Sequence, residues 1–336
     1  MTVQRDLVVI GASAGGVEAL RQVVRSLSPD FPAAVLVVMH LAPGAPTALP
    51  QILSRAGPLR AVPATHAGPL TKGVIHVAPP DHHLLVDEGA LMLSHGPTEN
   101  GHRPAINATF RSAAVAAGSR AIGVILSGAL HDGAVGLDAV LERGGLAMVQ
   151  DPADALYPGM PESALARVHT EHVYPADVLG KVLDRLVRAP AGAGPAEPPS
   201  PALLLEDRIA RDGVRRGAVA EELAAAASGY SCPDCQGALL ELGQQTGEYR
   251  CRLGHAWSAE ALLTARDAEL ERALWTALRS LDEKATLADR MQRDATGRGL
   301  AGLTGRYENT ARECGAAAET LRRFLLSLSQ EPEANP

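Results

Sequence analysis

The sequence predicts an α/β fold: a doubly wound, mostly parallel sheet with an appended hairpin, followed by a C-terminal zinc-ribbon-like and helical module. Three observations lead to this prediction. Apolar runs of strand length alternate with helical patterns from residue 6 to about residue 188. Some runs, such as Ala34–Met39, are continuously apolar, which is typical of strands buried on both faces of a parallel sheet. A cysteine cluster and a long helical pattern follow a stretch rich in proline and alanine.

The elements of the first part follow from hydrophobic periodicity. The middle stretch, residues 74–94, has closer strand spacing and predicts an antiparallel hairpin attached to the sheet. The predicted strands are Leu7–Ile10, Ala34–Met39, Val74–Ala78, His83–Val86, Leu91–Ser94, Ala121–Leu126 and Leu146–Gln150. The predicted helices are Gly16–Leu27, Thr47–Ala56, Ala105–Ala117, Ala134–Arg143 and Ala176–Arg188.

Composition divides the chain into four parts. Residues 1–188 form the predicted catalytic domain, and residues 189–202, APAGAGPAEPPSPA, form an extended linker. Residues 203–258 hold a short helical lead, expected over 203–227, and the cysteine cluster. Residues 259–330 are helical, and a break at Gly297–Gly305 predicts a helical hairpin or coiled coil. Because the linker separates the modules, we expect residues 1–190 to fold and react without the rest.

Bulk properties exclude several classes of protein. The 336 residues carry a net charge of −7, so there is no basic footprint for nucleic acid. Apolar runs are far shorter than the roughly 20 residues that span a membrane, and the first residues lack a signal-peptide core. The sequence therefore indicates a cytoplasmic protein without membrane insertion.

Three polar residues follow predicted parallel strands: Ser13 in a glycine-flanked turn, His40 and Asp132. In open α/β sheets the ligand crevice lies at the edge formed by these strand ends. A nucleophile, a base and an orienting carboxylate are what acyl transfer requires. Each residue alone is weak evidence, but their joint placement predicts a Ser-His-Asp site. The backbone amide of Ala14, at the start of a helix, is the expected oxyanion donor.

Two other α/β site types fit poorly. A dinucleotide site needs G-x-G-x-x-G and then an acidic residue at the end of the second strand. Here Ser13 takes the middle glycine position, and the second strand ends in Met39-His40. The α/β-hydrolase fold orders its triad Ser, Asp, His, whereas this chain gives Ser, His, Asp.

Several ordered motifs within residues 6–188 resemble the catalytic domain of CheB-type protein-glutamate methylesterases of bacterial chemotaxis. The resemblance implies hydrolysis of glutamate γ-methyl esters on the cytoplasmic domain of methylated chemoreceptors, and deamidation of particular receptor glutamines. It also implies that Ser13 is the nucleophile, His40 the general base and Asp132 its orienting carboxylate, with no cofactor for catalysis. The motifs are IGASAGG, VVMHL, IHVAPPDHHLLV, RPAINATFRSAA, ILSGALHDGAVGL and YPGMPESA.

The chain departs from the family pattern at several places. Met39 stands where the family usually has Gln, Asn107 stands where it commonly has Asp, and Gly128-Ala129-Leu130 replaces Gly-Met-Gly. The family's receiver domain has no counterpart before Leu7, so we expect activity that does not depend on phosphodonors. We expect a structural role for His131, while His83 either lines the cleft or is a satisfied hairpin histidine.

The cysteine cluster has the spacing of a metal site. Cys232, Cys235, Cys251 and His255 form the pattern C-x2-C-x15-C-x3-H, which predicts a closed tetrahedral zinc site with a structural or docking role. Removal of zinc is expected to unfold residues 230–258 and to spare the chemistry at Ser13. Cys314 lies far along the helical tail and is expected to be a buried free thiol.

The sequence leaves more than one function open. The first hypothesis is a serine ester hydrolase of the protein-glutamate methylesterase type, whose C-terminal helices bind signalling partners. The alternatives are a non-catalytic signalling adaptor that retains the fold, or a serine esterase acting on another ester. The complete set of Ser13, His40 and Asp132 argues against the adaptor.

Overall fold

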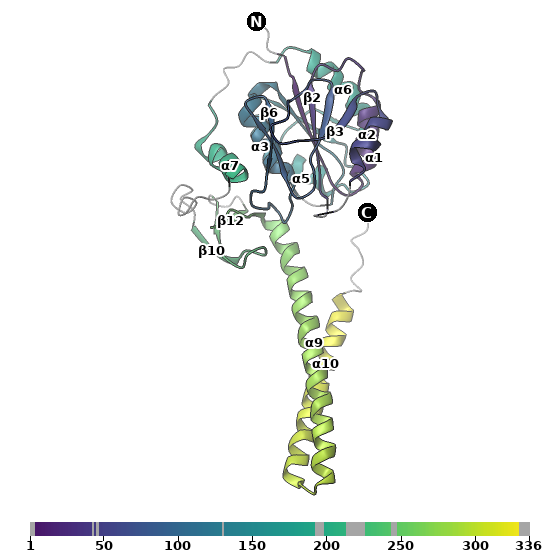
Figure 1. Ribbon diagram of the computed structural model, residues 1–336, viewed down its shortest axis with the longest axis vertical. Coiled ribbons are helices and arrows are strands. Elements are labelled where there is room, and N and C mark those ends of the chain that lie inside the picture. Colours follow the sequence, from purple (N-terminus) through teal and green to yellow (C-terminus); the bar gives the residue numbers. More distant parts are fainter. Residues whose placement is uncertain are drawn as a thin grey trace. The chain divides into compact units, whose positions relative to one another are not determined.

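A computed structural model describes residues 4–41, 44, 47–129, 131–191, 198–212, 226–242 and 247–328. The chain divides into two compact units, Met1–Leu262 and Leu263–Pro336, and each is described by itself. Figure 1 shows the elements of both units.

A parallel sheet forms the centre of the first unit. Within the described residues it contains seven strands in the order β3-β4-β2-β1-β7-β8-β9. The order reverses direction between β1 and β7, and ligand crevices of open α/β sheets lie at such a point. The strands are β1 (Leu7–Ala12), β2 (Ala34–Met39), β3 (Arg60–Pro63), β4 (Val74–Val77), β7 (Ala121–Ile125), β8 (Leu146–Gln150) and β9 (Val173–Tyr174).

Helices cover both faces of this sheet, as a doubly wound fold requires (Figure 1). Alternate residues of β1 serve the two faces: Val8 and Ile10 pack with α1, α2 and α6, whereas Leu7 and Val9 pack with α3, α4 and α5. The predicted α/β fold with a mostly parallel sheet is confirmed. The helices are α1 (Gly16–Arg25), α2 (Leu49–Ala56), α3 (Ile106–Ala117), α4 (Ala134–Glu142), α5 (Gly159–Arg167) and α6 (Ala176–Arg188), with a 3-10 turn at Gly118–Arg120.

The predicted hairpin over residues 74–94 needs correction. Val74–Val77 is β4 and pairs in parallel with both β2 and β3. The hairpin consists of β5 (His83–Asp87) and β6 (Ala90–Ser94), which pair with each other and pack against α3. β3, α5 and β9 were not predicted from the sequence. β3 and β9 are too short to produce a periodic signal, and α5 contains a proline near its start.

A second, antiparallel sheet follows in the same unit. We call it the Cys-His sheet; it consists of β10 (Ala226–Ser231), β11 (Ala238–Glu241), β12 (Glu248–Cys251) and β13 (Ala256–Ser258) in that order. It is preceded by α7 (Pro201–Asp212), which begins inside the expected linker because proline suits the first turn of a helix. The helical lead expected over 203–227 ends at Asp212; residues 213–225 lie outside the described residues, and Ala226 already belongs to β10.

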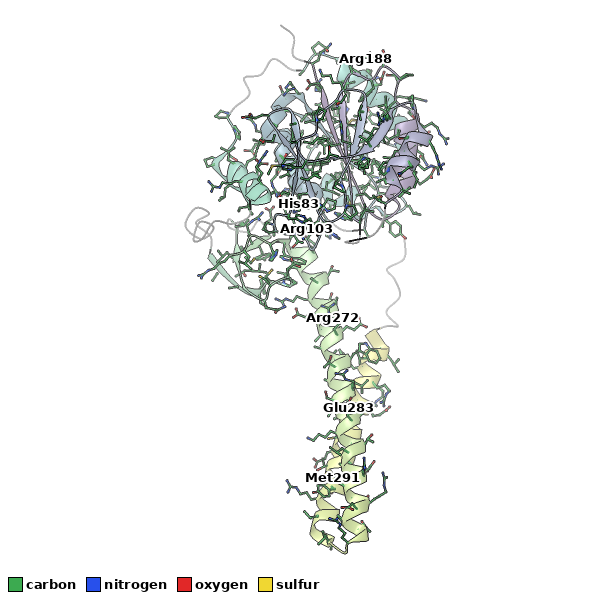
Figure 2. The ribbon with its side chains drawn as sticks, viewed as in Figure 1. His83, Arg103, Arg188, Arg272, Glu283 and Met291 are labelled. Atoms are coloured by element: carbon green, nitrogen blue, oxygen red, sulfur yellow. The ribbon has the colours of Figure 1, made fainter. Side chains whose placement is uncertain are left out.

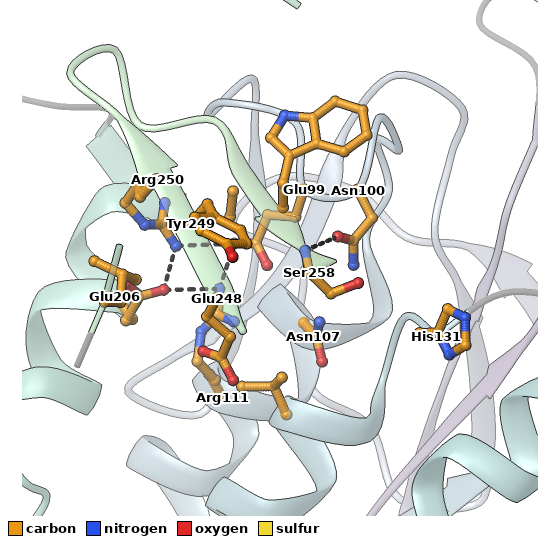
Figure 3. Close-up of a pocket in the computed structure, with 14 residues that line it drawn as sticks. Glu99, Asn100, Asn107, Arg111, His131, Glu206, Glu248, Tyr249, Arg250 and Ser258 are labelled. Carbon is orange, nitrogen blue, oxygen red and sulfur yellow. Dashed lines mark hydrogen bonds and ion pairs between the residues drawn. The ribbon is translucent and has the colours of Figure 1, made fainter. Parts of the chain in front are cut away.

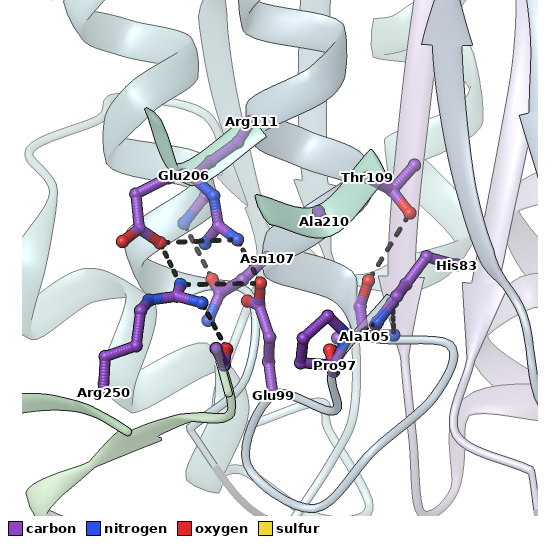
Figure 4. A network of polar contacts seen from close by, with 12 residues as sticks. His83, Pro97, Glu99, Ala105, Asn107, Thr109, Arg111, Glu206, Ala210 and Arg250 are labelled. Carbon is purple, nitrogen blue, oxygen red and sulfur yellow. Dashed lines mark hydrogen bonds and ion pairs between the residues drawn. The ribbon is translucent and has the colours of Figure 1, made fainter. Parts of the chain in front are cut away.

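Buried ion pairs join the Cys-His sheet to the rest of this unit (Figure 4). The Arg111 guanidinium on α3 donates to Glu99, and the Arg250 guanidinium on β12 donates to Glu206 on α7. Cross contacts of 3.8 Å (Arg111 to Glu206) and 3.9 Å (Arg250 to Glu99) close the set. The first compact unit extends to Leu262 and therefore includes the Cys-His sheet.

The second unit contains most of α9 (Ala259–Gly297) and all of α10 (Ala301–Leu328). The helices meet at the break expected near Gly297, and Gly299 has a φ of 70° there. Leu274, Leu278 and Leu281 of α9 pack with α10, while Arg272, Glu283 and Met291 are exposed along α9 (Figure 2). Cys314 is buried with a free thiol, as expected.

In the part of the chain that the structure describes, every helix is too short or too polar to cross a bilayer.

We predict that Glu99→Gln lowers the free energy of unfolding by about 3 kcal/mol, because it leaves two buried guanidinium groups with one carboxylate. Urea unfolding followed by Trp257 fluorescence, in a Trp275→Phe background, measures the change. Glu18→Gln is the matched control: its partner Arg21 is exposed, so the change should stay below about 0.5 kcal/mol. Equal effects from the two variants would contradict a stabilising role for the buried ion pairs.

Candidate active site

Ser13 lies directly after β1, in a tight turn that leads into α1. Its N–H donates to the Ser127 carbonyl at 3.0 Å, and its own carbonyl accepts from Gly16 N–H at 3.0 Å. Gly15 has a φ of 71°, and a Cβ there would lie 2.7 Å from the Ser127 hydroxyl oxygen. The turn therefore needs glycine at this position, and it holds the Ser13 hydroxyl at the strand-end edge of the sheet.

The His40 ring bridges the other two predicted site residues. His40 follows β2, and its Nδ1 lies 3.1 Å from Ser13 Oγ. Its Nε2 lies 2.8 Å from Asp132 Oδ2. When Nε2–H donates to the carboxylate, Nδ1 is left as an acceptor for the serine hydroxyl. The structure thus brings Ser13, His40 and Asp132 into one continuous hydrogen-bonded set.

Asp132 is a fully buried carboxylate with several donors. Besides His40, it accepts from the N–H of Ile106 at 2.6 Å and of Asn107 at 3.2 Å, at the start of α3. Burial alone raises the pKa of Asp132, but the hydrogen bond and charge of His40 and the Ile106 N–H outweigh it and lower this pKa below its usual value. Asp132 is therefore ionised beside His40, and the positive end of α3 helps to hold its charge.

Asn107 makes the reciprocal connection. Its side-chain oxygen accepts from Gly133 N–H at 3.0 Å and Gly136 N–H at 2.7 Å, at the start of α4. Each of the two helix N-termini is thus capped by a side chain from the other segment. The neutral amide oxygen of Asn107 is enough to accept these two hydrogen bonds. With Asn at this position, there is no second carboxylate next to Asp132.

His102 belongs to the same set, and the sequence analysis missed it. Its ring stacks on the His40 ring, with centroids 3.7 Å apart and planes within 9°. Burial and the charge of His40 lower the pKa of His102 to about 4. The ring is therefore neutral at pH 7 and adds no positive charge beside His40. The only sequence signal was its place beside the motif RPAIN, since it follows no strand.

The other two histidines considered from the sequence lie outside this set. His83 is buried, and its Nε2 lies 2.9 Å from the Pro97 carbonyl while its Nδ1 accepts from Ala105 N–H (Figure 4). It is the satisfied hairpin histidine of the two alternatives. His131 lines a small pocket with Asn107 and Arg111, where Figure 3 shows it.

Cys232, Cys235, Cys251 and His255 converge in the Cys-His sheet, and their ligand atoms lie within 4.8 Å of one another. The Sγ atoms of Cys235 and Cys251 are 3.7 Å apart, and His255 Nδ1 lies 3.7 Å and 3.4 Å from the Sγ atoms of Cys232 and Cys251. Zn–S and Zn–N bonds of standard length give tetrahedral edges of about 3.8 Å and about 3.6 Å. The three distances given are close to these edges, and three thiols with one imidazole are a ligand set that zinc accepts.

An α/β fold whose strand ends bring together a serine, a histidine and an aspartate defines a class of protein with the constellation used by serine hydrolases. A sequence profile of the CheB methylesterase family matches residues 8–183. The chain belongs to this family.

Curated relatives and a solved structure are similar over the same region. Protein-glutamate methylesterase/protein-glutamine glutaminase 2 of Anaeromyxobacter dehalogenans is 39 % identical over 183 residues, which is 54 % of each chain. Protein-glutamate methylesterase FrzG of Myxococcus xanthus is 39 % identical over 178 residues, 53 % of each chain. The crystal structure of the Thermotoga maritima CheB methylesterase catalytic domain aligns with a TM-score of 0.52 and 31 % identity, covering 55 % of this chain and 100 % of that one. The chain thus spans about half the length of the curated relatives it matches.

The stacked His102 predicts a specific pH dependence of stability. Between pH 4 and 6.5 the unfolded chain binds a proton at His102 that the folded chain does not, so stability rises with pH across this window. His102→Phe should remove roughly 3 kcal/mol of that dependence. Urea unfolding at several pH values measures the difference, and an NMR titration locates the midpoint of His102. A midpoint near 6.5 would contradict the burial of this ring.

Proposed function

We propose that the protein hydrolyses glutamate 5-O-methyl esters on the cytoplasmic domain of methylated chemoreceptors. The observation that carries this proposal is the hydrogen-bonded set Ser13, His40 and Asp132 at the reversal point of the sheet. Membership of the CheB methylesterase family, and the similarity to relatives named protein-glutamate methylesterases, support the choice of substrate. The proposal assigns the protein to the cytoplasm, where this substrate lies.

Each of the three residues has a defined part in the reaction. Ser13 Oγ attacks the ester carbonyl while His40 Nδ1 takes the hydroxyl proton, and Asp132 stabilises the imidazolium that forms. His40 then gives this proton to the leaving methoxide, so methanol departs and an acyl-serine remains. Water, deprotonated by His40, attacks the acyl group and releases free glutamate and Ser13. Attack on a glutamine side chain follows the same path with ammonia as the leaving group, which supports deamidation as a second activity.

The oxyanion of the tetrahedral intermediate needs donors near Ser13. The Ala14 N–H is our candidate, because it has no hydrogen-bond partner among the described residues and lies just before α1. The helix begins at Gly16, so its positive end faces the same turn.

Zinc, when bound by Cys232, Cys235, Cys251 and His255, supplies structural cross-linking and no chemistry to the reaction. The tetrahedral spacing of these ligand atoms supports this assignment. The helices α9 and α10 remain our candidates for binding signalling partners.

We expect Ser13→Ala to reduce methanol release from a methylated chemoreceptor fragment by at least 1,000-fold, with the fold unchanged. His40→Ala should cost a similar factor because the residues act as a unit, and Asp132→Asn should also cost orders of magnitude. Ser280→Ala, on α9, is the matched control and should match wild type. A non-catalytic adaptor would release no methanol in any variant, and an esterase for other substrates would cleave simple esters while leaving the receptor fragment intact.

Elemental analysis of the purified protein should find about one zinc per chain. Cys232→Ser should lower this ratio, whereas Cys314→Ser should not change it, since Cys314 lies on α10 outside the cluster. Full zinc content in Cys232→Ser would remove this residue from the ligand set.

A further inference from the structure

We propose that the Cys-His sheet is a positioning element of the active site. It binds residues 98–102, which we call the 98–102 loop, and so holds the His102 ring of this loop in its stacked position on His40. The inference rests on the proposed function and extends it by naming residues outside the family domain that set the geometry of the reacting histidine.

The 98–102 loop is bonded along its length to the Cys-His sheet. Asn100 N–H donates to the Ala256 carbonyl at 2.8 Å, and Ala256 N–H donates to the Thr98 carbonyl at 3.2 Å. The Asn100 side-chain oxygen accepts from Ser258 N–H at 2.8 Å (Figure 3), and the Thr98 hydroxyl donates to Asp234 at 2.7 Å. Main-chain and side-chain contacts thus hold the loop to β13 and to the turn between Cys232 and Cys235.

A short turn, closed by main-chain hydrogen bonds between Glu99 and His102, links these contacts to His102. Glu99 and His102 exchange two main-chain hydrogen bonds, of 3.2 Å and 2.9 Å. Gly101 has a φ of 74°, and a Cβ there would lie 3.4 Å from the Trp257 ring. The His102 ring therefore moves with Thr98 and Asn100, and it stacks directly on His40.

A second connection runs from the Cys-His sheet toward Asp132, which contacts His40 Nε2. Arg250 on β12 is 1 % exposed and donates to the Gly254 carbonyl and to Glu206, beside Arg111. Arg111 lies on α3 one turn after the N–H groups that hold Asp132. The Cys-His sheet thus contacts the loop that carries His102, and it is linked to the helix that holds the carboxylate through Glu99 and Glu206, which pair with both Arg250 and Arg111.

Three of the contact residues neighbour a predicted metal ligand in the sequence. Asp234 lies between Cys232 and Cys235, Arg250 precedes Cys251, and Ala256 follows His255. Binding of a metal by these ligands would therefore fix the contacts to the 98–102 loop, because local order at such sites depends on the ion. This differs from the expectation that metal removal spares Ser13.

Asn100 gives a clean test, because its φ is 52°. Asn100→Gly suits this backbone conformation and removes the oxygen that accepts from Ser258, whereas Asn100→Asp keeps an oxygen there and tolerates the same conformation. In the full-length protein we expect Asn100→Gly to lower kcat for methanol release about tenfold or more, with KM unchanged. Asn100→Asp should restore kcat to within about twofold of wild type, since it keeps the hydrogen bond.

The metal arm of the test compares Cys232→Ser with Cys314→Ser, both full length. We expect Cys232→Ser to slow labelling of Ser13 by a fluorophosphonate probe and to shift the NMR signals of the His40 and His102 rings, because loss of stacking changes their ring-current environment. Cys314→Ser should match wild type in both measurements.

The outcomes separate the two proposals. If wild type neither releases methanol nor reacts with the probe at Ser13, the proposed function fails. If wild type is active while Asn100→Gly and Cys232→Ser keep its kcat, labelling rate and histidine signals, the Cys-His sheet does not position the site and the inference is overturned. A change in KM alone would also overturn it, because it would indicate a role in substrate binding.

Discussion

The structure of the site depends on one buried charge, the carboxylate of Asp132. A carboxylate without contact to water must be satisfied by donors, and here they come from the His40 ring and from the first N–H groups of α3. Asp132 therefore fixes two things together: the start of α3 and the orientation of the imidazole. Asn107 completes the arrangement by capping α4 from the same turn.

The sequence was sufficient for the part of the site that lies at strand ends. Ser13 follows β1, His40 follows β2, and Asp132 lies in the loop after β7. These three strands are neighbours in the sheet. Parallel strands present their carboxyl ends at one edge of the sheet. Predicting the strands therefore also predicts that these residues lie near one another. His102 could not be found this way, because its position depends on how the loop before α3 packs. The short β3 and β9 were missed for want of a periodic pattern.

The expected linker shows a different limit of local composition. Proline and alanine over residues 189–202 suggest a change of segment, but they carry no information about what packs beyond them. The deciding residues lie far apart in the sequence and pair with one another. Glu99, Arg111 and Arg250 are buried, and Glu206 is partly buried. Single-sequence patterns rank such charges as surface residues, since unpaired charge is costly to bury.

The burial of Arg250 has a consequence for how the chain folds while it is being synthesised. Domains emerge from the ribosome from the N-terminus and fold as they appear. Ser13, His40, Glu99 and Asp132 all leave the ribosome well before Arg250 does. The nascent chain thus holds a nucleophile, a base and a carboxylate while Glu99 still lacks one of its two arginine partners. The contact between Glu99 and Arg250 can form only when the residues after the family domain have been synthesised.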